Sequence, residues 1–166
     1  MQPGRFDYDL SNCGIQRALD LLGEKWTLLI LREAIYGVRR FDDFARALHC
    51  GRGVLSDRLK KLVAANVFER RDYAEPGQRP RSEYWLTAKG RDLFPALMAF
   101  SQWSERWDPP AEGPVARVTH RRSGRPVQVI LSDDRRAKAI SFADLRIAPG
   151  PGARPVRKPR APAGVS

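Results

Sequence analysis

Cationic and hydroxyl side chains gather on one side of the segment Val54–Ala65, where they could bind nucleic acid. The leucines of this segment recur every three to four residues, which is the spacing of a helix with one buried face. The opposite face carries Asp57, Lys60 and Lys61, with Ser56 and Arg58 flanking it. Lysine, arginine and serine can bind phosphates or base edges, whereas Asp57 either accepts from a cytosine amino group or pairs with Lys61. A merely solvated helix surface is the competing explanation.

A second group of basic side chains lies in a predicted β-hairpin. The runs Val67–Tyr73 and Ser82–Leu86 are typical of strands, and a Pro-Gly turn signal lies between them. We expect this turn to hold Arg79 and Arg81 outward, where an arginine can enter a minor groove. The hairpin therefore has a basic tip.

Two helices are predicted before the basic segment, in addition to the first helix of the chain. Lys25–Tyr36 is apolar around most of its circumference, so it should be a buried central helix that ends before Gly37. Phe41–Leu48 has helical spacing and two aspartates in its first turn, where the helix dipole favours negative charge. Between them, Arg39 and Arg40 either contact the DNA backbone or brace Glu33 and the acidic start of the third helix.

The first and last helices each carry an apolar stripe. In the first, apolar residues lie at positions 15, 18, 19 and 22, with Asp9, Ser11 or Asn12 as the cap and Gly23 as the end. The last runs from Ala88 to about Trp107, with Thr87 as its cap and a kink at Pro95. The stripe of the last helix is wider than one small domain needs, so a partner subunit could cover the surplus. On this helix the expected interface consists of Leu97, Phe100, Trp103 and Trp107.

The order of these elements predicts a winged helix-turn-helix, mainly α with a small β-hairpin wing, in the α+β class. An α-helix fits the major groove of DNA, and a hairpin arginine can reach the neighbouring minor groove. Each element alone is weak evidence, whereas the ordered set is much stronger.

Charge divides the chain of 166 residues unevenly. The net charge is +11, of which residues 113–166 supply +9, from 12 basic and 3 acidic residues. Such an excess indicates a polyanionic partner, nucleic acid ahead of an acidic membrane. We predict an N-terminal arm over 1–9, the winged domain over 10–110, an extension over 111–147 and a disordered, proline-rich basic tail over 148–166. Within the extension, Val115–Thr119 and Val127–Leu131 are expected to pair around Ser123-Gly124.

Several motifs resemble those of HxlR-type transcriptional regulators. They are the run from Cys13 to Arg32, Gly37-Val-Arg-Arg-Phe41, Leu55-Ser-Asp-Arg-Leu59 and Glu83-Tyr-Trp-Leu-Thr-Ala-Lys-Gly90. The resemblance covers about residues 10–107 and implies a dimeric winged-helix DNA binder that controls neighbouring genes. It also implies that the first and last helices form the dimer, which adds Ile15 and Leu19 to the expected interface. By position, Gly51–Lys61, including Arg52, is the start and outer face of the recognition helix, and Gln78–Arg81 is the wing tip. Gly51 and Gly53 depart from the family pattern, so the operator cannot be carried over.

The two cysteines have alternative interpretations. In some proteins of the family that the chain resembles, a cysteine at the place of Cys13 senses oxidants or electrophiles, and a helix N-terminus can lower a thiol pKa. The competing explanation is a small buried hydrophobe. Cys50 could pair with Cys13 only if their Cα atoms lie within about 7 Å. A flavin, quinone or other aromatic effector against Trp103 and Trp107 is the less favoured alternative to a dimer core.

We therefore predict a cytoplasmic homodimeric regulator, a repressor that reads an inverted repeat of double-stranded DNA. Enzymatic motifs and metal-ligand spacings are missing from the sequence, and His49 and His120 are its two histidines, so no cofactor is expected. No apolar run is long enough for a membrane span. The alternatives are a nonspecific nucleic-acid-binding protein driven by the basic tail and a protein-interaction module that uses a winged helix without DNA.

Overall fold

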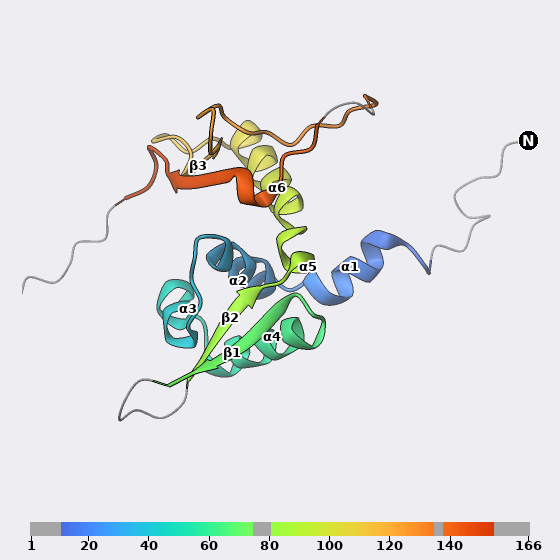
Figure 1. Ribbon diagram of the computed structural model, residues 1–166, viewed down its shortest axis with the longest axis vertical. Coiled ribbons are helices and arrows are strands. Elements are labelled where there is room, and N and C mark those ends of the chain that lie inside the picture. The colour runs from blue at the N-terminus through green and yellow to red at the C-terminus, as the bar shows by residue number, and fades with distance from the viewer. Residues whose placement is uncertain (1–10, 75–80, 135–137, 155–166) are drawn as a thin grey trace, which may run out of the picture. The chain divides into compact units, whose positions relative to one another are not determined.

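The structure, a computed structural model, describes residues 11–74, 81–134 and 138–154, and the chain divides into two compact units, residues 1–97 and 98–166. None of the described helices has the length and apolar character that crossing a membrane requires. The described elements are α1 (Gly14–Leu22), α2 (Lys25–Ile35), α3 (Phe41–Leu48), α4 (Arg52–Ala64), β1 (Phe68–Tyr73), β2 (Arg81–Leu86), α5 (Ala88–Arg91), α6 (Phe94–Trp107), β3 (Ala116–His120), a 3-10 helix (Phe142–Asp144) and β4 (Leu145–Pro149) (Figure 1).

Helix α2 lies at the centre of the core of the first unit, as its apolar circumference predicted. Its buried residues are Thr27, Ile30, Leu31 and Ala34. They belong to a buried cluster with Phe44 and Leu48 of α3, Leu55, Leu59 and Leu62 of α4, and Val67, Phe68 and Leu86 at the base of the hairpin. The Phe68 ring makes edge contacts with Phe44 and Tyr84, each at a centroid distance of 6.4 Å, which is a favourable arrangement for aromatic rings.

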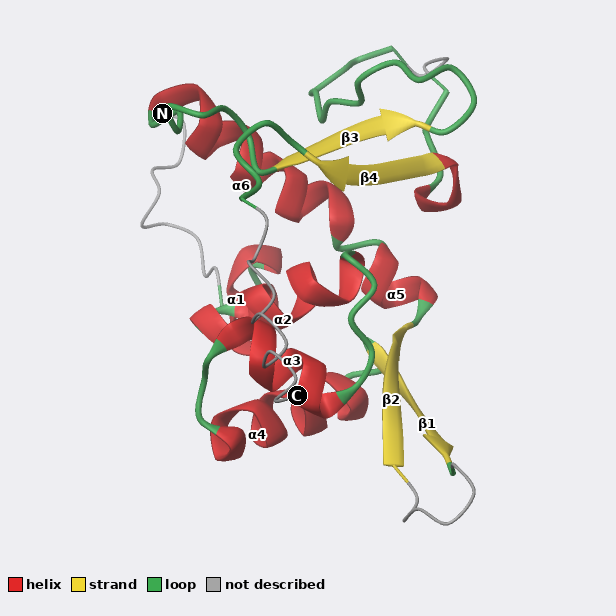
Figure 2. Cartoon of the chain, turned by 90° about the vertical axis from the view of Figure 1, so that its left-hand side faces the viewer, coloured by secondary structure: helices red, strands yellow, loops and turns green. Residues whose placement is uncertain are grey.

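The hairpin of β1 and β2 is the wing of a winged helix-turn-helix, which confirms the predicted α+β fold (Figure 2). Its antiparallel register runs from Phe68 opposite Leu86 to Tyr73 opposite Arg81. The chain ahead of α3 joins the edge of β2, because the Tyr84 amide donates to the Arg39 carbonyl at 2.8 Å and Arg40 forms a β-bridge with Glu83. The edge of β2 is therefore hydrogen-bonded to the segment between α2 and α3.

Three helix boundaries differ from the sequence prediction. Cys13 takes the cap position of α1, where Ser11 or Asn12 was expected, and Asp9 lies outside the described residues. Helix α4 begins at Arg52, so the glycine-containing segment before Val54 supplies the cap and the first turn. The predicted kinked helix is two helices, α5 and α6. Pro95 stands in the first turn of α6, where its missing N–H removes no helical hydrogen bond.

In the second unit, β3 pairs antiparallel with β4, from Ala116 opposite Pro149 to His120 opposite Leu145. The sequence prediction paired Val115–Thr119 with Val127–Leu131. This pairing is wrong except at Val127, whose amide donates a hydrogen bond to the Val118 carbonyl. Leu145 is buried, whereas Leu131 is fully exposed, so the more distant segment offers β3 a partner with an apolar anchor. Strand β4 also includes residues 148 and 149, which the sequence prediction placed in the disordered tail. Residues 155–166 lie outside the described part.

Candidate nucleic-acid interface

The outer face of α4 presents Asp57, Lys60 and Lys61 to solvent, while the leucines on its inner face are fully buried. Ser56 is half-buried at the edge of this face. Asp57 lies 4.0 Å from the Lys60 ammonium group, so its partner is Lys60 and not the expected Lys61. An exposed pair at this distance contributes little free energy, so both lysines remain able to bind phosphates or bases.

Arg58 has a different environment from the lysines beside it. Its side chain is 18% exposed, and its guanidinium pairs with Glu24, the cap residue of α2, at 3.0 Å. The Nε atom of Arg58 is buried without a hydrogen-bond partner among the described residues. The structure therefore places Arg58 between α4 and the start of α2, away from the exposed position expected of a DNA contact.

Arg52 joins the first turns of α3 and α4. Its guanidinium donates to the Asp42 carboxylate at 2.9 Å and lies over the Phe41 ring, 4.8 Å from the centroid. Both partners belong to the first turn of α3. The contact links the two helices that form the helix-turn-helix, although Arg52 remains largely exposed.

Arg39 and Arg40 brace the wing. The Arg39 guanidinium donates to the Ala34 and Val38 carbonyls and lies 4.9 Å from the centroid of Trp85. Arg40 pairs with Glu83 at 3.2 Å and stacks over Tyr73. The expected partners are occupied elsewhere, because Glu33 binds Arg32 and the aspartates of α3 bind Arg46 and Arg52.

The wing exposes cations that the sequence analysis did not single out. Arg70 donates to Asp72 and Ser82, and Arg71 pairs with Glu69 at 2.9 Å while lying over Trp85. Hydrogen bonds from Ser82 and then Arg70 hold the pKa of the Asp72 carboxyl below its usual value. Four consecutive charged residues, 69–72, break the alternation of a half-buried strand and were the available signal for a wing exposed on both faces.

Among the predicted wing-tip residues, Arg81 is exposed at the start of β2, opposite Tyr73. Gln78 and Arg79 lie outside the described residues. Within the first unit, the inner face of α4 packs against the base of the wing, and Arg81 lies at the opposite end of the hairpin.

Both cysteines are free thiols and partly exposed. Cys13 caps α1, and hydrogen bonds from the backbone amides of Gln16 and then Ile15 lower the pKa of its thiol below the ordinary value. Cys50 packs against the core cluster of the first unit. In the described ranges, no three His, Cys, Asp or Glu side chains are grouped so that they could hold a metal ion.

Most of the predicted interface residues are exposed in the single chain. Helix α1 has no buried residue, and Ile15 is 72% exposed. On α6, the side chains of Phe100, Trp103 and Trp107 are each more than 60% exposed. Leu97 differs from them because it packs against the core of the first unit.

The chain is similar to a known family of proteins and to individual relatives. A family model described as HxlR-like helix-turn-helix matches residues 21–112. An uncharacterized HTH-type transcriptional regulator of Mycobacterium tuberculosis, Rv3095, is 42% identical over 138 residues, which cover 83% of this chain and 86% of the relative.

Two solved structures are similar in sequence and in fold. The crystal structure of PA1607, described as a candidate transcription factor, superposes with a TM-score of 0.65 at 32% identity, covering 83% of this chain and 95% of that one. The redox regulator HypR in its reduced form gives a TM-score of 0.51 at 30% identity, covering 55% of this chain and 90% of that one.

Proposed function

Because the chain belongs to the HxlR-like helix-turn-helix family, we propose that this transcriptional regulator binds an inverted repeat of double-stranded DNA as a homodimer and represses the neighbouring genes. The observation that carries the proposal is α4 itself. Its inner face is anchored by three fully buried leucines, and its outer face presents Lys60 and Lys61 beside an antiparallel wing. This is the arrangement that places a helix in the major groove.

In this proposal, some side chains contact DNA and others hold those side chains in position. Lys60, Lys61 and Ser56 contact the major groove and its phosphates, and the wing tip, with Arg81 and the predicted Gln78 and Arg79, contacts the minor groove. Arg39, Arg40, Arg52 and Arg58 position these contacts, because their guanidinium groups bind protein partners within the first unit.

The exposed apolar side chains of α1 and α6 support the homodimer. Phe100, Trp103 and Trp107 offer large aromatic surfaces to water, and burial in a partner would remove that cost. A twofold dimer presents two recognition helices, which meet half-sites about 34 to 36 Å apart. The operator is then an inverted repeat, and its occupation blocks a promoter.

We further propose that oxidants or electrophiles regulate the protein through Cys13. This proposal is supported by the position of Cys13 at the start of α1, where the nearby backbone amides of Gln16 and Ile15 lower the pKa of its thiol, and by the likeness to a structure named as a redox regulator. A thiolate at this position would react with oxidants or electrophiles, and the adduct would alter the start of α1. A small-molecule effector remains the alternative trigger for release.

Selection from a random duplex library, followed by fluorescence anisotropy on the enriched site, tests the DNA-binding proposal. The variant Lys60→Ala/Lys61→Ala removes two exposed charges of α4. The matched control, Arg32→Gln/Arg46→Gln, removes two exposed charges that are already paired with Glu33 and Asp43.

We expect an enriched inverted repeat, about tenfold or greater loss of affinity in the lysine variant and little change in the control. No enriched site would overturn sequence-specific binding and favour nonspecific attraction by the basic tail. An enriched site without twofold symmetry would overturn the inverted repeat.

A further inference from the structure

The exposed cations of the two units differ in how they are compensated. In the first unit, most exposed arginines bind nearby carboxylates: Arg32, Arg40, Arg46, Arg52, Arg70 and Arg71. In the second unit, five basic side chains make no ion pair or hydrogen bond with any described residue: Arg117, Arg122, Arg125, Lys138 and Arg146. The second unit therefore holds positive charge that its own acidic residues do not neutralise.

Two of these arginines share one face of the β3–β4 sheet. In the antiparallel register, Arg117 lies opposite Ala148 and Thr119 lies opposite Arg146, so these four residues point to the same side. Arg117 and Arg146 are exposed, and they are diagonal neighbours, whose Cα atoms are separated by about 7 to 8 Å. We call these four residues the basic sheet face.

The other side of the same sheet is its apolar side. Leu145 is buried there, and Val118 and Ile147 are partly buried. The arginines of the basic sheet face thus add no packing to the second unit. Their side chains extend from strands whose opposite side is anchored by Leu145, Val118 and Ile147.

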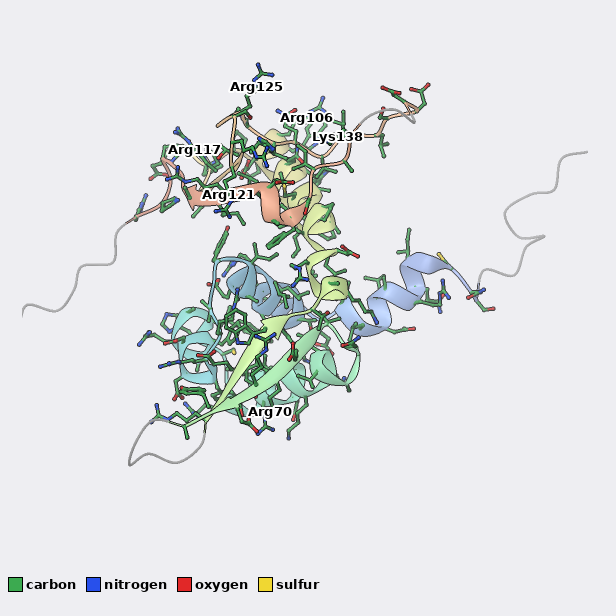
Figure 3. The ribbon with its side chains drawn as sticks, viewed as in Figure 1. Arg70, Arg106, Arg117, Arg121, Arg125 and Lys138 are labelled. Carbon is green, nitrogen blue, oxygen red and sulfur yellow. The ribbon has the colours of Figure 1, made fainter. Side chains whose placement is uncertain are left out.

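The turn after β3 adds two more exposed arginines to the second unit. It is fixed by the His120 amide donating to the Arg125 carbonyl and the Gly124 amide donating to the His120 carbonyl, both at 2.8 Å, with Gly124 in the left-handed region. Arg122 and Arg125 project from it into solvent. Figure 3 shows Arg117, Arg121 and Arg125 in the part of the chain that carries β3, with Arg106 and Lys138 also in the second unit.

We propose that the basic sheet face and the adjoining turn form a second DNA-binding surface, which binds the phosphate backbone of duplex DNA without reading its sequence. Arginines held on a hydrogen-bonded sheet, without partners among the residues that the structure describes, match the repeating charge of DNA. A two-stranded antiparallel sheet is also small enough to follow a groove. The surface lies outside residues 21–112, which the family model matches. The choice of DNA as the polyanion rests on the proposed function.

The test uses the full chain with Arg117→Gln/Arg146→Gln, compared with Arg32→Gln/Arg46→Gln, which removes the same charge from paired positions. Anisotropy is measured on two duplexes of about 40 base pairs, one of arbitrary sequence and one enriched from the random library, over a range of salt concentrations. Vesicles of phosphatidylglycerol and phosphatidylcholine form a third arm, and thermal melting by circular dichroism checks folding.

We expect the sheet variant to bind both duplexes about tenfold more weakly at 0.1 M salt, with the slope of log K against log salt reduced by about one for each arginine lost. The control should keep the wild-type slope. Equal slopes for the two variants, or a loss confined to the vesicles, would overturn the second surface. If no site is enriched but the sheet variant still loses affinity for arbitrary duplex, the second surface stands and the sequence-specific function fails.

Discussion

At the scale of single residues, Arg58 is a basic residue of α4 whose charge is paired with another helix. Helical periodicity predicts which side of α4 a residue occupies, but it says nothing of a carboxylate from another helix. Glu24, at the cap of α2, pairs with Arg58 and draws its side chain inward. The sequence pattern correctly predicted which residues lie on the outer side of α4. The contact with Glu24, which comes from another helix, determines that Arg58 is less exposed than Lys60 and Lys61.

We expect Glu24→Gln to destabilise the fold by about 1 to 2 kcal/mol, because the charge of Arg58 then lies in a mostly buried position with an unpaired Nε atom. Urea unfolding measures the change. Asp57→Asn is the matched control, since it removes a largely exposed carboxylate and should change the free energy of unfolding by less than about 0.5 kcal/mol. Equal effects of the two changes would show that the Glu24–Arg58 pair contributes nothing.

Cys13 offers a second test at this scale. The amides of Gln16 and Ile15 stabilise the thiolate only when α1 is folded, so the pKa is lowered in the folded state and the thiol ionises at lower pH than in the unfolded chain. By linkage, this contribution to stability is present above the unfolded pKa and is lost as the pH falls through the folded pKa.

In the variant Cys50→Ala, the pH profile of iodoacetamide alkylation should therefore have its midpoint at lower pH for the folded protein than for the same protein in urea. Mass spectrometry follows the adduct. A folded midpoint equal to or above the unfolded one would remove the physical basis of the redox response.

At the scale of elements, the types of helix and strand were predictable because apolar spacing is a local signal. Their limits depended on residues whose role varies with context. Gly53 precedes the segment predicted as helical and lies inside the first turn of α4, whereas Pro95 was predicted at a kink and lies in the first turn of a new helix. The pairing of β3 with β4 required contact between segments 25 residues apart, which periodicity does not encode.

Two glycines in helices should respond to alanine with opposite signs. A Cβ on Gly53 meets nothing within 4 Å, so Gly53→Ala should stabilise the fold by up to about 1 kcal/mol through helix propensity. A Cβ on Gly90 would collide with the Val67 carbonyl, so Gly90→Ala should destabilise by about 1 to 3 kcal/mol. Urea unfolding of both variants checks this, and a stabilising Gly90→Ala would contradict the tight contact of α5 with the base of the wing.

At the scale of the whole molecule, the ordered set of elements identified the fold class because few architectures combine three helices, an amphipathic helix and a hairpin. The DNA contacts and the dimer were expected from the same reasoning, and they concern surfaces that an isolated chain leaves uncovered. The exposed aromatic residues on α6 indicate a surface that a partner covers, since water is a poor environment for them.

We expect Phe100→Ala/Trp103→Ala to weaken self-association by about thirtyfold or more, as truncation of central aromatic anchors does in protein interfaces. Sedimentation equilibrium over a dilution series measures the dissociation constant. The control is Leu131→Ala, which shortens a fully exposed apolar side chain in the second unit and should leave association unchanged. An unchanged constant in the aromatic variant would place the dimer interface elsewhere, and a monomeric wild-type protein would remove the dimer altogether.

The distant partner of β3 also orders events during synthesis. The first unit is complete once residue 97 is free of the ribosome, whereas β3 must wait for β4, which ends at Pro149. At roughly 5 to 20 residues per second, the interval lasts about 3 to 10 seconds. During that time β3 still lacks its partner strand, so the residues of the winged helix are available for folding before the proposed second surface can form.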